Sequence, residues 1–441
     1  MVPIEGESES DRSDFEISSS SADQSVSQSR RCLVLGRGSG LVKQILSDLG
    51  LHCTEGRVSW RVLWSPRGVP LNVYKQLAVH QLVNRLPASQ TLTRKDALVI
   101  NIRRMVKRYG SAHFGSLVPK TFLLPSECEA LQEAMAVKPD SLWIVKPAAG
   151  SQGTDIRVIR SRKKPLLKSN AIVSRYIRPY LIEEPYTIDP DQLSNRFIHL
   201  TNVAINRHHP QYDDVSEDGH KRRLSRLWEH LGPERSERVK AAIETLIAKT
   251  IICGHASLTT AIQHHVPPNR VGQLFELFGF DVLLDRKLHP WLLEVNRSPT
   301  LTGSSKLDTE VKTAMLSDLF SLVGVTSTIR SSSATPTKRS VIVDTDGEYE
   351  RRGQWCRVYP RHEPLPRAAL AQFFEERKTR VMATMLCSRI PETPGRSFLT
   401  QEREKLSSGI LLERDDIKLL KHMRHKFGLH YSSVRSSRTD R

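Results

Sequence analysis

The sequence predicts a mixed α/β (α+β) protein, and its most informative part is a β-hairpin with polar residues inside its strands. Two stretches, 278–284 and 291–295, are apolar enough for buried strands, and turn residues separate them. A third strand, Trp143–Val145, runs into a lysine and a loop of small residues. The stretch Arg235–Cys253 has the apolar spacing of a long helix. Strands combined with helices in this way are typical of α/β proteins.

Composition and charge limit the classes of protein that this chain can be. The chain has 441 residues, is 38% hydrophobic and carries a formal net charge of +18. The length fits roughly two to three domains, and the charge indicates an acidic partner, whether nucleic acid, an anionic membrane or an acidic protein surface. The 6 cysteines show no Cys-x-x-Cys spacing, which argues against a zinc site or a disulfide framework. The scattered cysteines fit a reducing compartment, and the expected location is the cytoplasm. We also expect no membrane span and no secretory signal.

The composition also divides the chain into four parts. Residues 1–30 are acidic and rich in serine, which predicts a disordered tail. Residues 31–325 contain the strongly periodic apolar segments and form the expected folded domain. Residues 326–340 are a linker rich in Ser, Thr and Pro, and residues 341–441 form a basic C-terminal extension with sparse helical segments.

Apolar spacing predicts the elements of the folded part. A strand-to-helix turn is expected at Gly36–Gly40, which fits neither the P-loop pattern nor the dinucleotide-binding fingerprint. On the basic helix at Asp96–Tyr109, Leu98, Ile102 and Val106 share one face. Besides the segments above, the expected elements are strands at Cys32–Leu35, Ile156–Ile159 and Ala171–Ile177, a strand and turn at Leu63–Pro70, and helices at Leu41–Leu49, Tyr74–Val83, around Leu131–Met135 and at Thr309–Val323.

Three polar residues interrupt the apolar strands of the hairpin: Asp281, Glu294 and Asn296. Glu294 and Asn296 are two positions apart and so share one face of a strand, and Asp281 can face them from the other strand. A buried carboxylate is costly unless it is paired or bound to a metal. Two carboxylates and an amide oxygen form an all-oxygen ligand set that suits Mg²⁺ bound to nucleotide phosphates. The alternative is that Arg or backbone donors satisfy both carboxylates.

A second candidate site element lies at the end of the strand Trp143–Val145. Lys146 follows three large apolar residues and precedes the loop 147–153, which is rich in Ala, Gly and Ser. A lysine beside such a loop can hold phosphate, although an ordinary surface lysine at a strand end is an equal alternative. A lysine-bearing strand, a flexible loop and a later acidic hairpin, in this order, are the parts of an ATP-grasp fold. In such ligases Mg²⁺ clamps the phosphates of ATP.

Several motifs then occur in an order that resembles the tubulin–tyrosine-ligase-like family, and within it the polyglutamylases. The resemblance covers about residues 63–325. The segments that carry it are Asn84–Pro87 with Leu92–Asp96, Val118–Glu127, Trp143–Pro147 with Ser151–Gly153, Val173–Ile177, His199–Asn202, the hairpin residues Asp281, Glu294 and Asn296, and Tyr349–Trp355.

The resemblance implies an ATP-grasp ligase with a small N-terminal domain followed by central and C-terminal nucleotide-binding domains. Its implied reaction is the addition of free L-glutamate to glutamate side chains of the acidic tails of tubulin, with ATP and Mg²⁺ as cofactors. The implied partners are tubulin and microtubules, with no membrane and no nucleic acid. The implied location is the cytoskeleton, including the cilium or basal body, and residues 341–441 are a candidate microtubule-binding region.

The resemblance also assigns roles to individual residues. Lys95 and Lys146 would contact phosphates, and Lys221 would bind the glutamate substrate. We expect Lys146, Glu294 and Lys221 to be the catalytic residues. The other implied nucleotide contacts are Gln152 and Gly153 in the loop, Ser174, Arg175, Tyr176 and Ile177 along the adenine, and Thr201 and Asn202.

One segment departs from the family pattern. Family members carry a Lys-Phe-Asp-Leu-Arg motif and a strand pair where this chain has only the residues between Tyr180 and Leu193, which indicates an internal deletion near 181–192. The missing arginines would bind phosphate and the amino-acid substrate, and loss of one such donor costs about a hundredfold in rate. In addition, Asp155 replaces a loop glycine.

Two competing hypotheses follow. A catalytically impaired relative would bind microtubules through its basic surface without ligating glutamate. Nucleic-acid binding rests on charge alone, because no RNA-recognition, zinc-finger or helix-turn-helix pattern is present.

Overall fold

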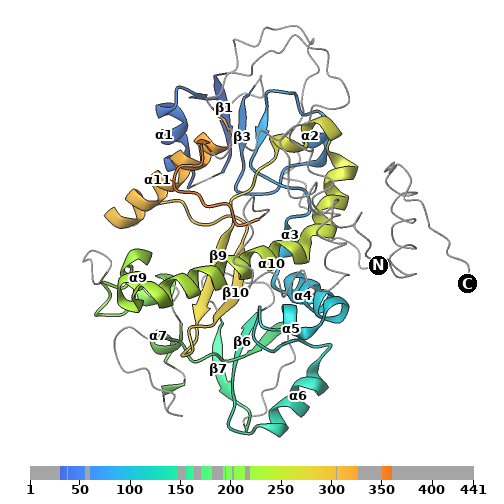
Figure 1. Ribbon diagram of the computed structural model, residues 1–441, viewed down its shortest axis with the longest axis vertical. Coiled ribbons are helices and arrows are strands. Elements are labelled where there is room, and N and C mark those ends of the chain that lie inside the picture. Colours follow the sequence, from blue (N-terminus) through green and yellow to red (C-terminus); the bar gives the residue numbers. More distant parts are fainter. Residues whose placement is uncertain are drawn as a thin grey trace, which may run out of the picture. The chain divides into compact units, whose positions relative to one another are not determined.

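The computed structural model describes residues 30–36, 38–54, 60–147, 155–162, 170–180, 192–193, 195–200, 203–213, 219–303, 305–325 and 350–359. These residues form a mixed α/β structure, as the sequence predicted (Figure 1). Their strands lie in three sheets: a four-stranded sheet near the N-terminus, a second four-stranded sheet in the middle of the chain, and the two-stranded hairpin.

The N-terminal sheet is parallel, with the strand order β2-β1-β3-β4. Helix α1 packs against α11, a helix from much later in the chain, and buried residues of both join those of the sheet in one apolar cluster. The strands and helices of this region are β1 (Arg31–Val34), α1 (Gly40–Asp48), β2 (His52–Cys53), β3 (Val62–Trp64), α2 (Leu71–Lys75), β4 (Leu82–Val83) and α11 (Lys306–Leu322).

The helix expected over Tyr74–Val83 was wrong for all but its first two residues. Helix α2 ends at Lys75, and Leu82 and Val83 form strand β4 beside Val62 and Leu63. Pairing with β3 buries both residues of β4, and this tertiary gain outweighs the weak helical preference of the local sequence.

The middle sheet is antiparallel, with the strand order β5-β8-β6-β7. Phe122, Trp143 and Val173 lie in its core beside Leu131 and Met135 of helix α6. Basic helix α4 precedes this sheet and buries Leu98 and Ile102, as expected. The elements are α3 (Gln90–Thr93), α4 (Lys95–Tyr109), α5 (Ser111–Phe114), β5 (Thr121–Leu123), α6 (Cys128–Val137), β6 (Leu142–Pro147), β7 (Arg157–Arg160) and β8 (Ala171–Arg175).

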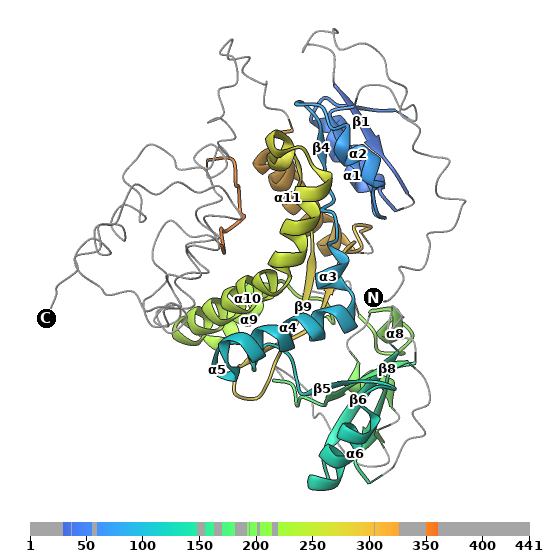
Figure 2. The ribbon, with the colours of Figure 1, turned by 90° about the vertical axis from the view of Figure 1, so that its right-hand side faces the viewer.

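Helix α10 (Pro233–His265) follows the short helices α7 (Arg196–His199) and α8 (Val203–Asn206) and helix α9 (Leu224–Leu231). It is the one described helix whose length and composition would allow it to cross a membrane, so the expectation that no run is long and apolar enough was wrong for this segment. The helix nevertheless packs against α3, α4, α9 and the hairpin, and both views place α4 next to it (Figures 1 and 2). These contacts are those of a core helix.

The predicted hairpin is formed by β9 (Gly279–Leu284) and β10 (Pro290–Asn296). Backbone hydrogen bonds connect the hairpin with β4 of the N-terminal sheet and with the segment that precedes β5 of the middle sheet. Phe275, just before β9, donates its N–H to the Val83 carbonyl at 3.0 Å, and Leu292 of β10 donates to the Leu117 carbonyl at 2.9 Å. The hairpin is therefore held from two sides.

A short segment beyond the expected linker packs back on the folded domain. The Gln354 N–H donates to Asp318 of α11 at 2.9 Å, and the Trp355 indole donates to the Met315 carbonyl at 3.3 Å. Trp355 packs against the N-terminal apolar cluster, and Tyr359 packs against a second cluster formed by α4, α10 and the hairpin. The predicted tail at 1–30, apart from Arg30, the linker at 326–340 and most of the extension lie outside the described residues.

Candidate functional site

The three predicted metal ligands come together on one face of the hairpin. Glu294 is the cross-strand partner of Asp281, and Asn296 is the partner of Gly279. A β-bulge between Leu292 and Glu294 shifts the register by one residue. The shift buries Leu292 in the core although Glu294, two residues later, belongs to the polar cluster. Bulges occur often beside functional sites, where they redirect a side chain.

The side chains of the triad are in contact. The Asn296 amide nitrogen lies 3.4 Å from Asp281 Oδ1 and 3.4 Å from Glu294 Oε1. Asp281 is accessible to solvent, but partial loss of its hydration to the surrounding protein and the negative charge of Glu294 together raise its pKa to about 6. Two carboxylates held this close repel one another, and bound positive charge would relieve that repulsion.

Two predicted phosphate-binding lysines lie beside the carboxylates. Lys95, at the start of α4, places its Nζ 3.0 Å from Glu294 Oε2. Lys146, at the end of β6, is surrounded by protein on most sides, and this burial lowers its pKa, with a further contribution from the positive charge of Lys95. The attraction of Glu294 and Asp281 partly opposes this shift. Three elements far apart in the sequence, α4, β6 and the hairpin, therefore supply one charged cluster.

This donor set fits a hard divalent cation. Asp281, Glu294 and Asn296 supply only oxygen ligands for such an ion once the Asn296 amide turns its oxygen inward, and oxygen is what Mg²⁺ selects. The described residues contain no cluster of three or more His, Cys, Asp or Glu that would suit a different metal. A site with two carboxylates leaves coordination positions for phosphate oxygens or water.

The residues expected to line an adenine lie at the end of β8. The Ser174 hydroxyl contacts the Thr121 hydroxyl at 2.9 Å, so it points toward β5. The Arg175 N–H donates to the Lys120 carbonyl and the Tyr176 N–H to the Leu142 carbonyl. The Tyr176 hydroxyl contacts His199 Nδ1 at 3.1 Å, and this contact joins the segment to α7. Ile177, the last expected contact, is half-buried just beyond β8.

Lys221 lies apart from the contacts described above. Its Nζ pairs with Asp308 Oδ2 at 2.8 Å near the start of α11, where Lys312 also approaches the same oxygen at 3.4 Å. No contact between Lys221 and the hairpin triad is seen in the described part of the chain. Its expected role in glutamate binding stays a prediction.

Four expected nucleotide contacts lie outside the described residues: Gln152, Gly153, Thr201 and Asn202. Most of the segment with the expected deletion, residues 181–191, also lies outside them. Asp155, at the edge of the loop, has a φ of 56°. Glycine adopts such a backbone conformation most easily, which agrees with the view that Asp155 replaces a glycine.

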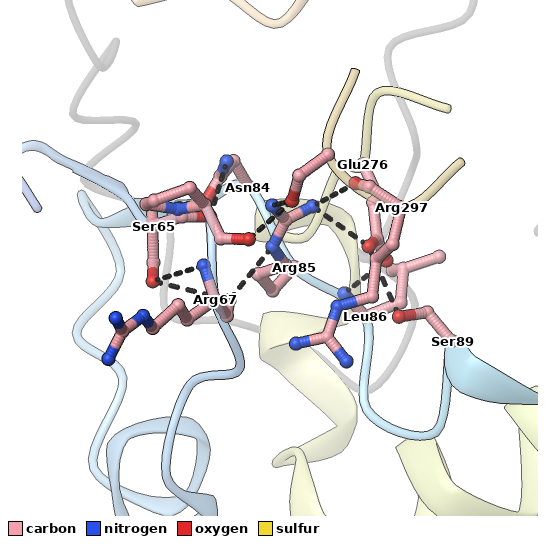
Figure 3. A network of polar contacts seen from close by, with 10 residues as sticks. Ser65, Arg67, Asn84, Arg85, Leu86, Ser89, Glu276 and Arg297 are labelled. Carbon is pink, nitrogen blue, oxygen red and sulfur yellow. Dashed lines mark hydrogen bonds and ion pairs between the residues drawn. The ribbon is translucent and has the colours of Figure 1, made fainter. Parts of the chain in front are cut away.

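A buried polar network behind the hairpin was not anticipated from the sequence. Arg85, between β4 and α3, pairs with Glu276 at 2.9 Å, and only 4% and 0% of their side-chain surfaces are exposed. Figure 3 shows these two residues between Arg67, Leu86, Ser89 and Arg297. The signal in the sequence was a charged residue within an apolar run, Phe275–Phe278, but its partner is 191 positions away.

Taken together, the cluster of two lysines, two carboxylates and an amide has the chemistry of a site for phosphates and a divalent cation on a mixed α/β fold. The model of the tubulin-tyrosine ligase family matches residues 73–185 and 183–333, which together exceed half of the chain. The chain belongs to the tubulin-tyrosine ligase family. The two matched stretches meet at 183–185, inside the segment where the family pattern is interrupted.

Three similar proteins are named as tubulin polyglutamylases or monoglutamylases. Tubulin polyglutamylase TTLL5 of Mus musculus is 35% identical over 327 residues, which cover 65% of this chain and 24% of that protein. Tubulin monoglutamylase TTLL4 of Homo sapiens is 31% identical over 323 residues, which cover 64% and 27%. Tubulin polyglutamylase TTLL13 of Mus musculus is 31% identical over 374 residues, which cover 76% and 44%. The matched part of this chain thus spans from about a quarter to less than half of the length of these relatives.

Proposed function

We propose that this chain is an ATP- and Mg²⁺-dependent ligase that adds free L-glutamate to glutamate side chains in the acidic tails of tubulin. The observation that carries the proposal is the convergence of Lys95, Lys146, Asp281, Glu294 and Asn296 on one site. Family membership and the names of the relatives supply the reaction and the substrate. The fold we propose is accordingly the ATP-grasp type.

The proposed reaction has two steps. A side-chain carboxylate of the tubulin tail attacks the γ-phosphorus of ATP, which gives an acyl phosphate and releases ADP. The amine of free glutamate then attacks the acyl carbon, loses a proton and expels phosphate, so that an isopeptide bond forms. Splitting the reaction in this way replaces a poor leaving group by a good one.

The residues of the site have distinct parts in this scheme. Asp281, Glu294 and Asn296 would hold Mg²⁺, which when bound would neutralise phosphate charge. Lys146 lies at the half-buried end of β6, and a phosphate would supply the negative charge that favours its ammonium form. Lys95 pairs with Glu294 and would bridge this ligand and a phosphate oxygen.

The proposal also includes a role for the positive charge of the chain and a location in the cell. A net charge of +18 would attract an acidic tail and speed the encounter with it. We place the protein in the cytoplasm on the cytoskeleton, including the cilium or basal body, with residues 341–441 as a microtubule-binding region.

The test is glutamate incorporation by the full chain. Purified protein is incubated with radiolabelled glutamate, ATP, Mg²⁺ and either intact microtubules or microtubules whose acidic tails have been removed by protease. We expect incorporation into intact microtubules alone, and a loss of at least about a hundredfold in Glu294→Gln. Glu133→Gln, a substitution at an exposed glutamate of α6, is the matched control and should keep full activity.

Two results would contradict the proposal. Equal incorporation by Glu294→Gln and the wild type would show that the metal assignment is wrong. ATP binding without any incorporation by the wild type would show that the interruption near 183–185 has removed the ligase activity from this chain.

A further inference from the structure

We propose that Arg85 is a positioning residue, which together with Glu276 holds the cation-binding hairpin and the segment that leads to Lys95 in one fixed geometry. The inference rests on the function proposed above, because it assigns a role toward the same cation site. Neither residue contacts the triad directly. Both act through the backbone on either side of it.

Arg85 binds the segment immediately after the triad. Its guanidinium donates to the Arg297 carbonyl at 2.8 Å and to the Ser298 hydroxyl, and Arg297 directly follows the ligand Asn296. Its Nε donates to the Arg67 carbonyl at 3.0 Å, so the end of β10 is tied to the loop after β3. The Ser298 hydroxyl also donates to the Pro66 carbonyl in that loop. The position of Asn296 is therefore set from the N-terminal sheet.

Glu276 binds the segment that precedes Lys95. One carboxylate oxygen accepts the Leu86 N–H at 3.0 Å, and the other accepts the Ser89 hydroxyl at 3.1 Å and the Arg85 guanidinium at 2.9 Å. These contacts fix the turn between β4 and α3, and α4 with Lys95 at its start follows α3. Since Glu276 itself lies three residues before β9, the beginning and the end of the hairpin and the path to Lys95 meet at one ion pair (Figure 3).

The chemistry of the pair favours a geometric role over a purely stabilising one. A fully buried ion pair gains little net stability, because the desolvation of both charges offsets most of their attraction. Arginine, however, offers several donors in a rigid plane, and here it reaches four acceptors on three separate segments. A lysine at this position would keep the positive charge but would lose the planar arrangement of several donors. What the arginine adds is therefore the fixed spacing of those segments.

The experiment measures cation binding without catalysis. Mn²⁺ is titrated into the full chain, and the free ion is followed by electron paramagnetic resonance. Arg85→Lys should weaken Mn²⁺ binding about tenfold, at the lower end of the range for residues that support metal ligands indirectly. The control is Arg61→Lys, since Arg61 also donates to three backbone carbonyls, but these belong to the segment just after α11 and to the β3–β4 connection instead of the hairpin. It should lower thermal stability while Mn²⁺ affinity stays within about twofold of the wild type.

Further variants keep the proposal testable if Arg85→Lys does not fold. Arg85→Met combined with Glu276→Gln removes both buried charges, so we expect it to fold and still to bind Mn²⁺ more weakly. Ser298→Ala should weaken binding in the same direction and to a smaller extent. If the folded Arg85 variants and Ser298→Ala bind Mn²⁺ as tightly as Arg61→Lys, the positioning role is refuted. If Glu294→Gln binds Mn²⁺ as the wild type does, the cation site of the proposed function fails instead.

Discussion

Glu294 lies directly opposite Asp281 because the β10 strand contains one extra residue at Leu293. In an unbroken register Leu293 would face Asp281, and Glu294 would pair with Phe280 instead. The bulge thus converts an apolar strand with two isolated polar residues into a strand that presents Glu294 and Asn296 on the same face as Asp281. The cation site that we propose at this hairpin depends on that single irregularity, and the four predictions below concern residues around it and beyond it.

Gly279→Ala should weaken cation binding while the protein remains folded. Gly279 is the cross-strand partner of Asn296, and an added Cβ would lie 3.2 Å from the Pro299 Cβ and 3.5 Å from the Asn296 Cβ. The contact with Pro299 is the tight one, so Pro299 would have to shift, and this would disturb Asn296 three residues before it, at a cost of roughly 1–3 kcal/mol. Mn²⁺ titration measures the effect. Gly272→Ala, whose Cβ would meet nothing within 4 Å, is the control, and equal affinities of the two variants would contradict the prediction.

Lys146→Met should stabilise the protein in the absence of nucleotide and impair nucleotide binding. Burial lowers the pKa of Lys146, so the folded state disfavours its charge, and a methionine of similar shape removes this cost. We expect thermal unfolding a few degrees higher and ATP binding weaker by at least about tenfold. Differential scanning calorimetry and equilibrium dialysis with ATP measure the two effects. A variant that is less stable than Lys138→Met, a change at an exposed lysine, would refute the first expectation.

Leu288→Gly should stabilise the hairpin turn. Leu288 has a φ of 63°, within a turn in which the Asp285 carboxylate accepts the N–H groups of Lys287 and His289. The left-handed conformation costs a leucine about 1–2 kcal/mol, and the extra entropy of an unfolded glycine offsets roughly 0.5–1 kcal/mol of the gain. A net rise in the free energy of unfolding of up to about 1.5 kcal/mol is expected in urea titrations. Leu288→Ala keeps the strained backbone, so a similar gain in that variant would rule out this explanation.

Stability should fall as the pH drops below about 6.5, in part because of His80. Burial lowers the pKa of His80, and the positive charge of Arg61 lowers it further. The Nε2 atom of His80 is buried without a hydrogen-bond partner among the described residues. The unfolded chain therefore takes up a proton on this side chain before the folded protein does, and acid favours unfolding.

His80→Gln should make the pH dependence shallower between about pH 7 and pH 5. Thermal unfolding recorded at half-unit steps of pH measures the slope, with His52→Gln as a control for the loss of an exposed histidine. A slope equal to that of the wild type would show that other groups govern the acid response.

The parts of the site that could be predicted from the sequence are those with a local signature. Asp281, Glu294 and Asn296 stood out because polar residues are rare in buried strands, and Lys146 because it ends an apolar strand beside a loop of small residues. The order of these motifs along the chain predicted that the four residues belong to one site. The bulge at Leu293 had no such signature, because register depends on which side chains the rest of the fold buries.

Contacts between distant segments could not be predicted. The helical spacing of Tyr74–Val83 was real, but pairing with β3 decided the conformation of Leu82 and Val83. The partner of Glu276 could not be identified either, since the motif Asn84–Pro87 contains Arg85 but does not indicate which residue its guanidinium binds. A buried charge predicts that a partner exists, and only the fold shows which residue it is.

The segment Arg351–Tyr359 packs on the folded domain, and it determines where a fragment of this protein must end if the fragment is not to aggregate. The family match stops at residue 333, and a fragment cut there would lack Trp355 and Tyr359, which cover parts of two apolar clusters. The uncovered surface on α11 and beside α10 would favour aggregation of the truncated protein. Expression work on the folded core should therefore place its C-terminal boundary after Tyr359.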